Sequence, residues 1–357
     1  MEHIGIELGA KTSHLVVFDQ SGALLLRTSV RTPALGAWLR GRPMSRVVME
    51  SCTQSHAVAR LSQQAKHTTV VIPRTVVRAL GIGRRGIKTD DKDAETLALA
   101  SVRNQDLPSV HLRSVASRSH HETVTARALL VRARTRVITH IKSWLRGRLV
   151  HLKTKASKTF SQTVRELALE HNEGIPISLD VLLASHDTLS EQIERLDATM
   201  IQLAADHAIC RRMMTIPGVG PVVALSFVAH VDDIARFETA EQLASYFALV
   251  PGEATTGGKL KRTGTIKSGP TYMKSLLIQA AWSHWRSAAM SPPALWAKAL
   301  GERRGKRIAI VALARKLTKM MFAMWRDQKE YRPRLPAQVS STTPSSNVID
   351  IGEMMIA

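Results

Sequence analysis

Four acidic side chains in the first hundred residues have the type and placement needed to hold divalent metal. Glu7 and Glu50 each directly follow a short apolar run that predicts a strand. Asp90 and Asp93 lie three residues apart at the start of a helical pattern, so they share one face of that predicted helix. Carboxylate oxygens that converge on two metal ions would support phosphoryl-transfer chemistry.

Each acid also has a simpler interpretation. Glu7 and Glu50 can be surface acids, and Asp90 can be the N-cap of its helix, a common role for aspartate. Two acids that directly follow apolar strands are uncommon, however, because a carboxylate is poorly placed for burial unless something pairs with it. The joint placement therefore favours a metal site.

A glycine-containing turn between two apolar helical segments predicts a helix–hairpin–helix motif at residues 213–221. Its Gly218 and Gly220 would let backbone N–H groups approach a phosphate at the start of the following helix. The alternative is a tight connection chosen for helix packing. In a chain this basic, phosphate contact is favoured.

A basic, glycine-rich loop follows at residues 251–269. A glycine-flanked hydroxyl in such a loop could act as a nucleophile toward a phosphodiester, although such loops more often only contact backbone phosphates. The cations of this loop are Lys259, Lys261, Arg262 and Lys267.

Single-sign basic stripes on two predicted helices point to a nucleic-acid partner, because solvated charged faces normally mix signs. The first stripe includes Arg127, Arg132, Arg134, Arg136, Arg146 and Arg148, and the second includes Arg315 and Lys316. The tryptophans at 282, 285, 296 and 325 sit among apolar helices, where we expect core packing rather than base stacking.

Composition supports the same partner. The chain has 357 residues with 50 Lys and Arg against 29 Asp and Glu, a formal net charge of +21 that favours a polyanion. Its two cysteines have no second cysteine at metal-ligand spacing, which indicates a reducing compartment. No apolar run approaches membrane-spanning length and no signal pattern opens the chain, so we expect a cytoplasmic protein with no membrane partner.

The order of elements predicts an α/β domain followed by all-α parts. Strands, and then strands alternating with helices, indicate a mixed sheet with helices over residues 1–150, where a long basic helix ends the domain. Residues 151–211 carry a heptad-like pattern that predicts a helical or coiled-coil arm for self-association. Residues 212–330 read as a mostly helical domain, and residues 331–357 as a disordered tail.

Several motifs occur together in an order that is typical of one family. They are Ile4–Glu7, Glu50–Ser51, Lys88–Ala94, Ile216–Gly220, Ala248–Pro251 and Ala312–Leu317. Over roughly residues 3–330 the chain resembles the DEDD-type transposases of insertion sequences, a family that includes the pilin-gene invertases and the bridge-RNA-guided recombinases.

The resemblance implies a RuvC-like, ribonuclease-H-type N-terminal domain whose four acids bind two Mg²⁺ ions. It also implies a C-terminal transposase domain whose serine forms a covalent bond to DNA. Two subunits would contribute to each composite site, in a homodimer or homotetramer. A structured non-coding guide RNA would pair with donor and target DNA, so that base pairing selects the sequence.

Carried over by position, the metal ligands are Glu7, Glu50, Asp90 and Asp93, and the nucleophile is Thr256. Two positions depart from the family pattern, which has aspartate at residue 7 and serine at residue 256. The hydroxyls of Thr255 and Ser268 are the alternatives if the loop is shifted. Two further functions stay open: a metal-dependent Holliday-junction nuclease that forms no covalent intermediate, and a nucleic-acid-binding relative with an impaired site.

Overall fold

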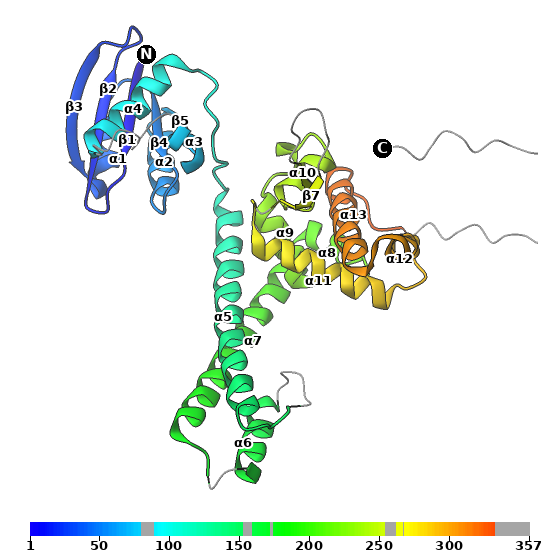
Figure 1. The fold of residues 1–357 in the computed structure, drawn as a ribbon. Helices are drawn as coiled ribbons and strands as arrows, with labels where there is room; N and C mark the ends of the chain where they lie inside the picture. The colour runs from blue at the N-terminus through cyan, green and yellow to red at the C-terminus, as the bar shows by residue number, and fades with distance from the viewer. Residues whose placement is uncertain (80–88, 153–158, 172–173, 254–261, 267, 333–357) are drawn as a thin grey trace, which may run out of the picture. The chain divides into compact units, whose positions relative to one another are not determined.

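The computed structural model describes residues 1–79, 89–152, 159–171, 174–253, 262–266 and 268–332. The chain divides into two compact units, Met1–Arg113 and Ser114–Ala357 (Figure 1). The first unit ends well before the predicted boundary at residue 150, because the long basic helix packs within the second unit. The predicted tail, from residue 333 onward, lies outside the described residues.

The first unit is built on a five-stranded sheet with the order β3-β2-β1-β4-β5. Its strands are β1 (Glu2–Glu7), β2 (Thr12–Phe18), β3 (Leu24–Arg31), β4 (Ser45–Glu50) and β5 (Thr68–Ile72). The β1–β2 and β2–β3 pairs are antiparallel, whereas β1–β4 and β4–β5 are parallel. The predicted mixed sheet is therefore confirmed.

Helices cover both faces of this sheet. They are α1 (Leu35–Arg40), α2 (Ser55–Gln64), α3 (Arg74–Ala79) and α4 (Asp90–Arg103). Ile4 and Ile6 of β1 pack in one core with Leu39 of α1 and Val58 of α2. Because strand side chains alternate, the intervening Gly5 faces the opposite side, where α4 lies.

The second unit is mostly helical, as expected. Its helices are α5 (Val115–Arg146), α6 (Phe160–His171), α7 (Ile177–Asp206), α8 (Ala208–Met213), α9 (Pro221–Val231), α10 (Ala240–Tyr246), α11 (Thr271–Ser287), α12 (Pro292–Arg304) and α13 (Lys306–Arg326). A small antiparallel hairpin, β6 (Pro251–Glu253) with β7 (Arg262–Thr265), lies between α10 and α11 in the chain.

Two hydrophobic cores stabilise the second unit. The larger one gathers apolar side chains of α8, α9, α11 and α13, including Phe227, Leu277 and Leu313. The smaller one lies where α5, α6 and α7 meet and includes Ile141, Phe160 and others. The predicted arm is thus a helical assembly in which α7 packs on α5; coiled-coil geometry stays a prediction.

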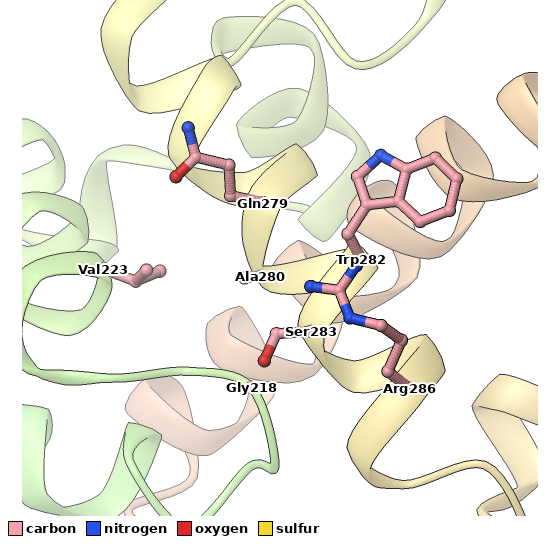
Figure 2. Close-up of a pocket in the computed structure, with 7 residues that line it drawn as sticks. All are labelled: Gly218, Val223, Gln279, Ala280, Trp282, Ser283 and Arg286. Atoms are coloured by element: carbon pink, nitrogen blue, oxygen red, sulfur yellow. The ribbon is translucent and has the colours of Figure 1, made fainter. Parts of the chain in front are cut away.

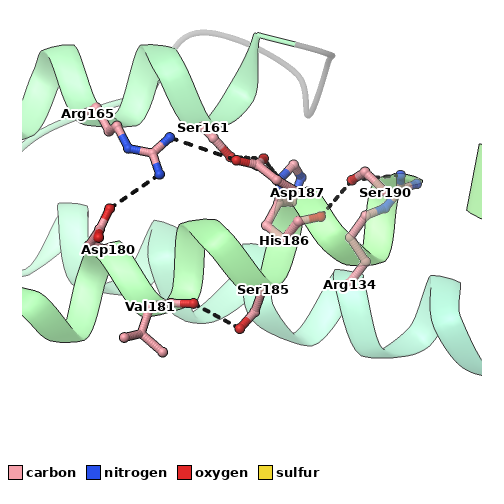
Figure 3. Close-up of polar contacts among 9 residues, drawn as sticks. All are labelled: Arg134, Ser161, Arg165, Asp180, Val181, Ser185, His186, Asp187 and Ser190. Carbon is pink, nitrogen blue, oxygen red and sulfur yellow. Dashed lines mark hydrogen bonds and ion pairs between the residues drawn. The ribbon is translucent and has the colours of Figure 1, made fainter. Parts of the chain in front are cut away.

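A polar network fastens α6 to α7 in this arm (Figure 3). The Ser161 Oγ lies 3.1 Å from the Nδ1 of His186 and also hydrogen-bonds to Asp187. That Nδ1 also lies 3.0 Å from Asp187 Oδ1. Burial alone would raise the pKa of Asp187, but the hydrogen bonds from Ser161 and His186 outweigh it and lower the pKa. Since the serine and aspartate share one imidazole nitrogen and the serine is buried, the network is a structural contact and not a catalytic triad.

The tryptophans differ from the expectation of uniform core packing. Trp325 is buried, and Trp282 and Trp285 are partly buried against the larger core. Trp296 is 41% exposed, and the Lys316 ammonium lies 4.5 Å from its ring centroid. In the part of the chain that the structure describes, no helix combines the length and hydropathy needed to span a bilayer.

Candidate active site at the end of the sheet

The direction of α4 across the sheet determines where its acidic residues lie. The Nδ1 of His3 lies 2.8 Å from the Oγ of Ser101, near the end of α4. Further along β1, Gly5 lies against the backbone of Ala94 and Ala98, near the beginning of α4. Helix α4 therefore runs antiparallel to β1, and its first turn reaches the end of the strand that carries Glu7.

The two strand-end acids are neighbours on the face that α4 covers. Ile6 of β1 pairs with Met49 of β4 in parallel register, so the next rung brings Glu7 beside Glu50. Adjacent strands lie about 4.8 Å apart. Glu7 is two residues after Gly5 in the same strand, so its side chain lies on the face of the sheet that α4 covers.

The acids of α4 differ in their environment. Asp93 is 4% exposed and belongs to the buried, sheet-facing side of α4. Asp90 is exposed, and the N-cap of α4 is Thr89, whose hydroxyl accepts a hydrogen bond from the N–H of Lys92 at 3.4 Å. The N-cap interpretation of Asp90 is therefore wrong.

The sequence reasoning missed a histidine and a third aspartate at this edge. His14 pairs with Glu7 across the antiparallel β1–β2 ladder. Its Nδ1 lies 2.6 Å from Asp91 Oδ1, and its Nε2 lies 3.8 Å from Asp90 Oδ2. The signal that could have revealed it is the turn at residues 8–11, which folds His14 back beside Glu7.

The donor set suits a hard divalent cation, but its side chains are not gathered around one point. Carboxylate oxygens are the ligands that Mg²⁺ prefers. Glu50 Oε1 lies 3.5 Å from the Nε of Arg74 at the start of α3, an ion pair between a partly buried glutamate and an exposed arginine that sequence reasoning also missed. Among the described residues, no three Asp, Glu, His or Cys side chains form a group that could hold a metal ion. The backbone thus brings the four predicted acids to one edge of the sheet, and metal binding by them stays a prediction.

The predicted nucleophile loop is bounded by β6 and β7. Pro251 pairs with Thr265, and Glu253 pairs with Arg262, in the small hairpin. The predicted residues Thr255, Thr256, Lys259, Lys261 and Lys267 lie outside the described residues. The alternative hydroxyl, that of Ser268, belongs to an exposed residue.

The glycines of the predicted helix–hairpin–helix motif have different surroundings. Gly218 has a φ of 90°, and a Cβ there would lie 2.6 Å from the backbone nitrogen of His284 in α11. The buried His284 fixes the turn, because its Nδ1 lies 2.7 Å from Pro217 O. Gly218 thus allows close packing of the turn on α11, whereas Gly220 has open space around it; the phosphate contacts of both glycines stay predictions.

The predicted basic stripe on α5 is partly used within the protein. Arg127 forms an ion pair with Asp197 of α7 and donates to the hydroxyl of Tyr272 at 2.7 Å. Desolvation lowers the pKa of Arg127, but its contacts with Asp197 and Tyr272 outweigh that and raise the pKa. Arg127 is therefore engaged in the packing of the helical unit, and its predicted contact with nucleic acid stays a prediction.

The other arginines of the stripe are more accessible. Arg132 donates to the carbonyl of Ala128, and Arg134 donates to Ser190 Oγ at 3.3 Å. The remaining members, Arg136, Arg146 and Arg148, are exposed. In the second stripe, Arg315 has a buried Nε that has no hydrogen-bond partner among the described residues.

Comparisons with known proteins agree with this arrangement. A transposase family model of the DEDD type matches residues 4–149, and the model of the Transposase IS116/IS110/IS902 family matches residues 210–293. A probable family 20 transposase of Pseudomonas aeruginosa is 26% identical over 93% of this chain and 99% of its own length. The transposase for insertion sequence element IS1111A of Coxiella burnetii is 27% identical over 92% of this chain and 91% of its own. The transposase for insertion sequence element IS1328 of Yersinia enterocolitica is 26% identical over 90% of this chain and 96% of its own.

These family matches and relatives identify the chain as a DNA transposase. The chain belongs to the DEDD-type insertion-sequence transposase family.

Proposed function

We propose that this transposase cuts and exchanges DNA strands with two Mg²⁺ ions held by Glu7, Glu50, Asp90 and Asp93. The observation that carries the proposal is the antiparallel passage of α4 over β1, which brings Asp93 to the strand ends of Glu7 and Glu50. Bound Mg²⁺ would neutralise charge on the phosphate that is attacked.

The proposed nucleophile is the hydroxyl of Thr256. Its oxygen forms a bond to phosphorus while one phosphorus–oxygen bond of the DNA backbone breaks, and the hydroxyl proton passes to the leaving oxygen. The product is a covalent protein–DNA ester and a free hydroxyl end of DNA. This transesterification conserves the energy of the phosphodiester, so the strand can be rejoined to a new partner without an external energy source.

Sequence selection is assigned to a structured guide RNA that pairs with donor and target DNA, and the working assembly to a homodimer or homotetramer. The formal charge of +21 and the exposed arginines of α5 support a large polyanionic partner. Sequencing the RNA that copurifies with the full-length protein tests this part. Recovery of no discrete RNA would remove the guide from the proposal.

The nucleophile is tested on protein that is recovered from cells together with its bound DNA. After addition of Mg²⁺, the DNA is labelled and a denaturing gel shows whether it is covalently attached to the protein. We expect labelled DNA to migrate with the wild-type protein and with Thr255→Ala, the matched control one residue away. Thr256→Ala should abolish this adduct. An undiminished adduct in Thr256→Ala would exclude this nucleophile, and cleaved DNA without any adduct would identify a junction nuclease in which water attacks.

The metal site is tested with two substitutions in helix α4, one at Asp93 and one at a control position. Asp93→Asn should lower strand cleavage by at least about 100-fold, because metal ligation contributes several kcal/mol to the transition state. The control is Glu95→Gln, since Glu95 instead pairs with Arg27 of β3 at 2.8 Å. Equal activity in both variants would contradict the assignment of Asp93.

A further inference from the structure

An open pocket of about 670 Å³ lies in the helical unit between the Pro217–Gly220 turn and helix α11. Its volume is within the range of small-ligand sites, roughly 300–1,000 Å³. Figure 2 shows its lining: the side chains of α11 on one side, and Gly218 of the turn with Val223 of α9 on the other.

One face of α11 supplies every polar group of this pocket. Gln279, Trp282, Ser283 and Arg286 have the spacing i, i+3, i+4 and i+7, so they form a continuous strip along the helix. In Figure 2 the guanidinium of Arg286 extends back along the helix toward Trp282. The strip therefore combines an amide, an aromatic ring, a hydroxyl and a cation.

The wall of the pocket at Gly218 is closely packed backbone. A Cβ at Gly218 would lie 2.6 Å from His284 N and 2.8 Å from Ala280 O of α11, so no side chain fits between the turn and the helix. The turn cannot relax into the space, because His284 bonds both to Pro217 O and to Ser291 Oγ. The pocket is thus built into the packing of the unit.

The pocket is electrostatically positive. Among the described residues that line it, none carries a carboxylate. Arg286 is exposed and has no hydrogen bond or ion pair with any described residue. The ammonium of Lys306, at the start of α13, lies 5.3 Å from the ring centroid of Trp282, a cation–π contact that adds a second cation beside the ring.

We propose that this pocket binds one unpaired nucleotide, with its base against Trp282, its polar edge toward Gln279 and its phosphate on Arg286. An aromatic ring beside two cations suits a stacked base and its phosphate, whereas the bases of a duplex have their faces covered. The proposal rests on the proposed function in that the chain must handle nucleic acid. It assigns Trp282 a role beyond the core packing expected from the sequence.

The test measures binding of the full-length chain to fluorescent single-stranded DNA, single-stranded RNA and duplex DNA of one sequence at fixed salt. Trp282→Ala should weaken single-strand binding on the order of tenfold, and Trp282→Phe should retain most of it, because a stacked base depends on the aromatic face. Arg286→Gln should reduce the slope of log affinity against log salt by about 0.7, as expected for one lost phosphate contact to a single strand. The strand that loses affinity identifies the nucleotide as DNA or RNA.

The matched control is Trp296→Ala, which removes an exposed tryptophan of α12 outside the pocket and should leave single-strand affinity unchanged. Photocrosslinking of 5-iodouracil-containing strands, followed by peptide mapping, should place the adduct on residues 279–286. Wild-type affinity in Trp282→Ala, equal losses in Trp296→Ala, or a crosslink elsewhere would each overturn the pocket assignment. Failure of the wild-type chain to bind any nucleic acid would instead overturn the proposed function.

Discussion

Replacing Gly5 by alanine should separate the acids of the candidate active site. A Cβ at Gly5 would lie 2.1 Å from the carbonyl oxygen of Ala94 and 2.5 Å from the backbone nitrogen of Ala98. Both atoms belong to the backbone of α4, so no side-chain rotation can relieve the contact. The helix must move by more than about 1 Å to restore an ordinary carbon–oxygen distance, roughly 3.4 Å.

That movement has two measurable effects. Overpacking of this kind costs about 1–3 kcal/mol of folding free energy. A displacement of about 1 Å at reacting groups can lower the rate on the order of 100-fold. We therefore expect Gly5→Ala to lower the unfolding temperature and, well below that temperature, to cut DNA about 100-fold more slowly than wild type.

The assay pairs thermal unfolding by circular dichroism with the rate of Mg²⁺-dependent strand cleavage. Gly41→Ala is the matched control, because a Cβ at Gly41 would find its nearest neighbour, Trp38 O, at 3.5 Å. Wild-type stability and cleavage in Gly5→Ala would refute the close approach of α4 to β1, and with it the convergence of Asp93 on Glu7.

Three further predictions concern the helical unit. Burial lowers the pKa of His284, so the contribution of this side chain to stability should be constant above pH 6.5 and fall as the pH drops below it, which urea titrations at pH 7.5 and 5.5 would measure. His284→Ala should lower the free energy of unfolding by about 1–3 kcal/mol, because it leaves Pro217 O without its hydrogen bond. Burial raises the pKa of Cys210 to about 12, so iodoacetamide should label the exposed Cys52 and leave Cys210 unmodified in the folded protein, as mass spectrometry of peptides would show. Arg127→Met should lower the unfolding temperature more than Arg136→Met, because only Arg127 leaves the partly buried Asp197 and Tyr272 without their partner; equal shifts would contradict the structural role of Arg127.

The sequence was sufficient to predict a mixed sheet with helices, because its short apolar runs are bounded by turn or polar signals. The runs that precede Glu7 and Glu50 are examples, since they form the strands β1 and β4. The short helix α1 and the arm helix α6 were not predicted. Helix α1, with six residues, has too few turns for its periodicity to stand out from a loop.

The candidate site was predictable in part. The positions of Glu7, Glu50 and Asp93 follow from strand ends and a helix start. Their placement at one edge of the sheet depends on the parallel β1–β4 register and on the direction of α4, which are tertiary features that no local pattern contains. Gly5 did carry a signal, since a glycine inside an apolar strand often marks close backbone approach. The ion pair of Arg74 with Glu50 had none.

The two separate hydrophobic cores of the helical unit give it unequal cooperativity. Among the described residues, the core around Phe160 draws on α5, α6, α7 and their connections, whereas the core around Phe227 includes side chains of α8, α9, α11 and α13. The region around Phe160, which we call the tip of the arm, can therefore unfold locally while the region around Phe227, the body of the unit, stays folded. Amide hydrogens near Phe160 would then exchange with solvent sooner than those near Phe227, and the tip would tolerate changes of length that the body would not.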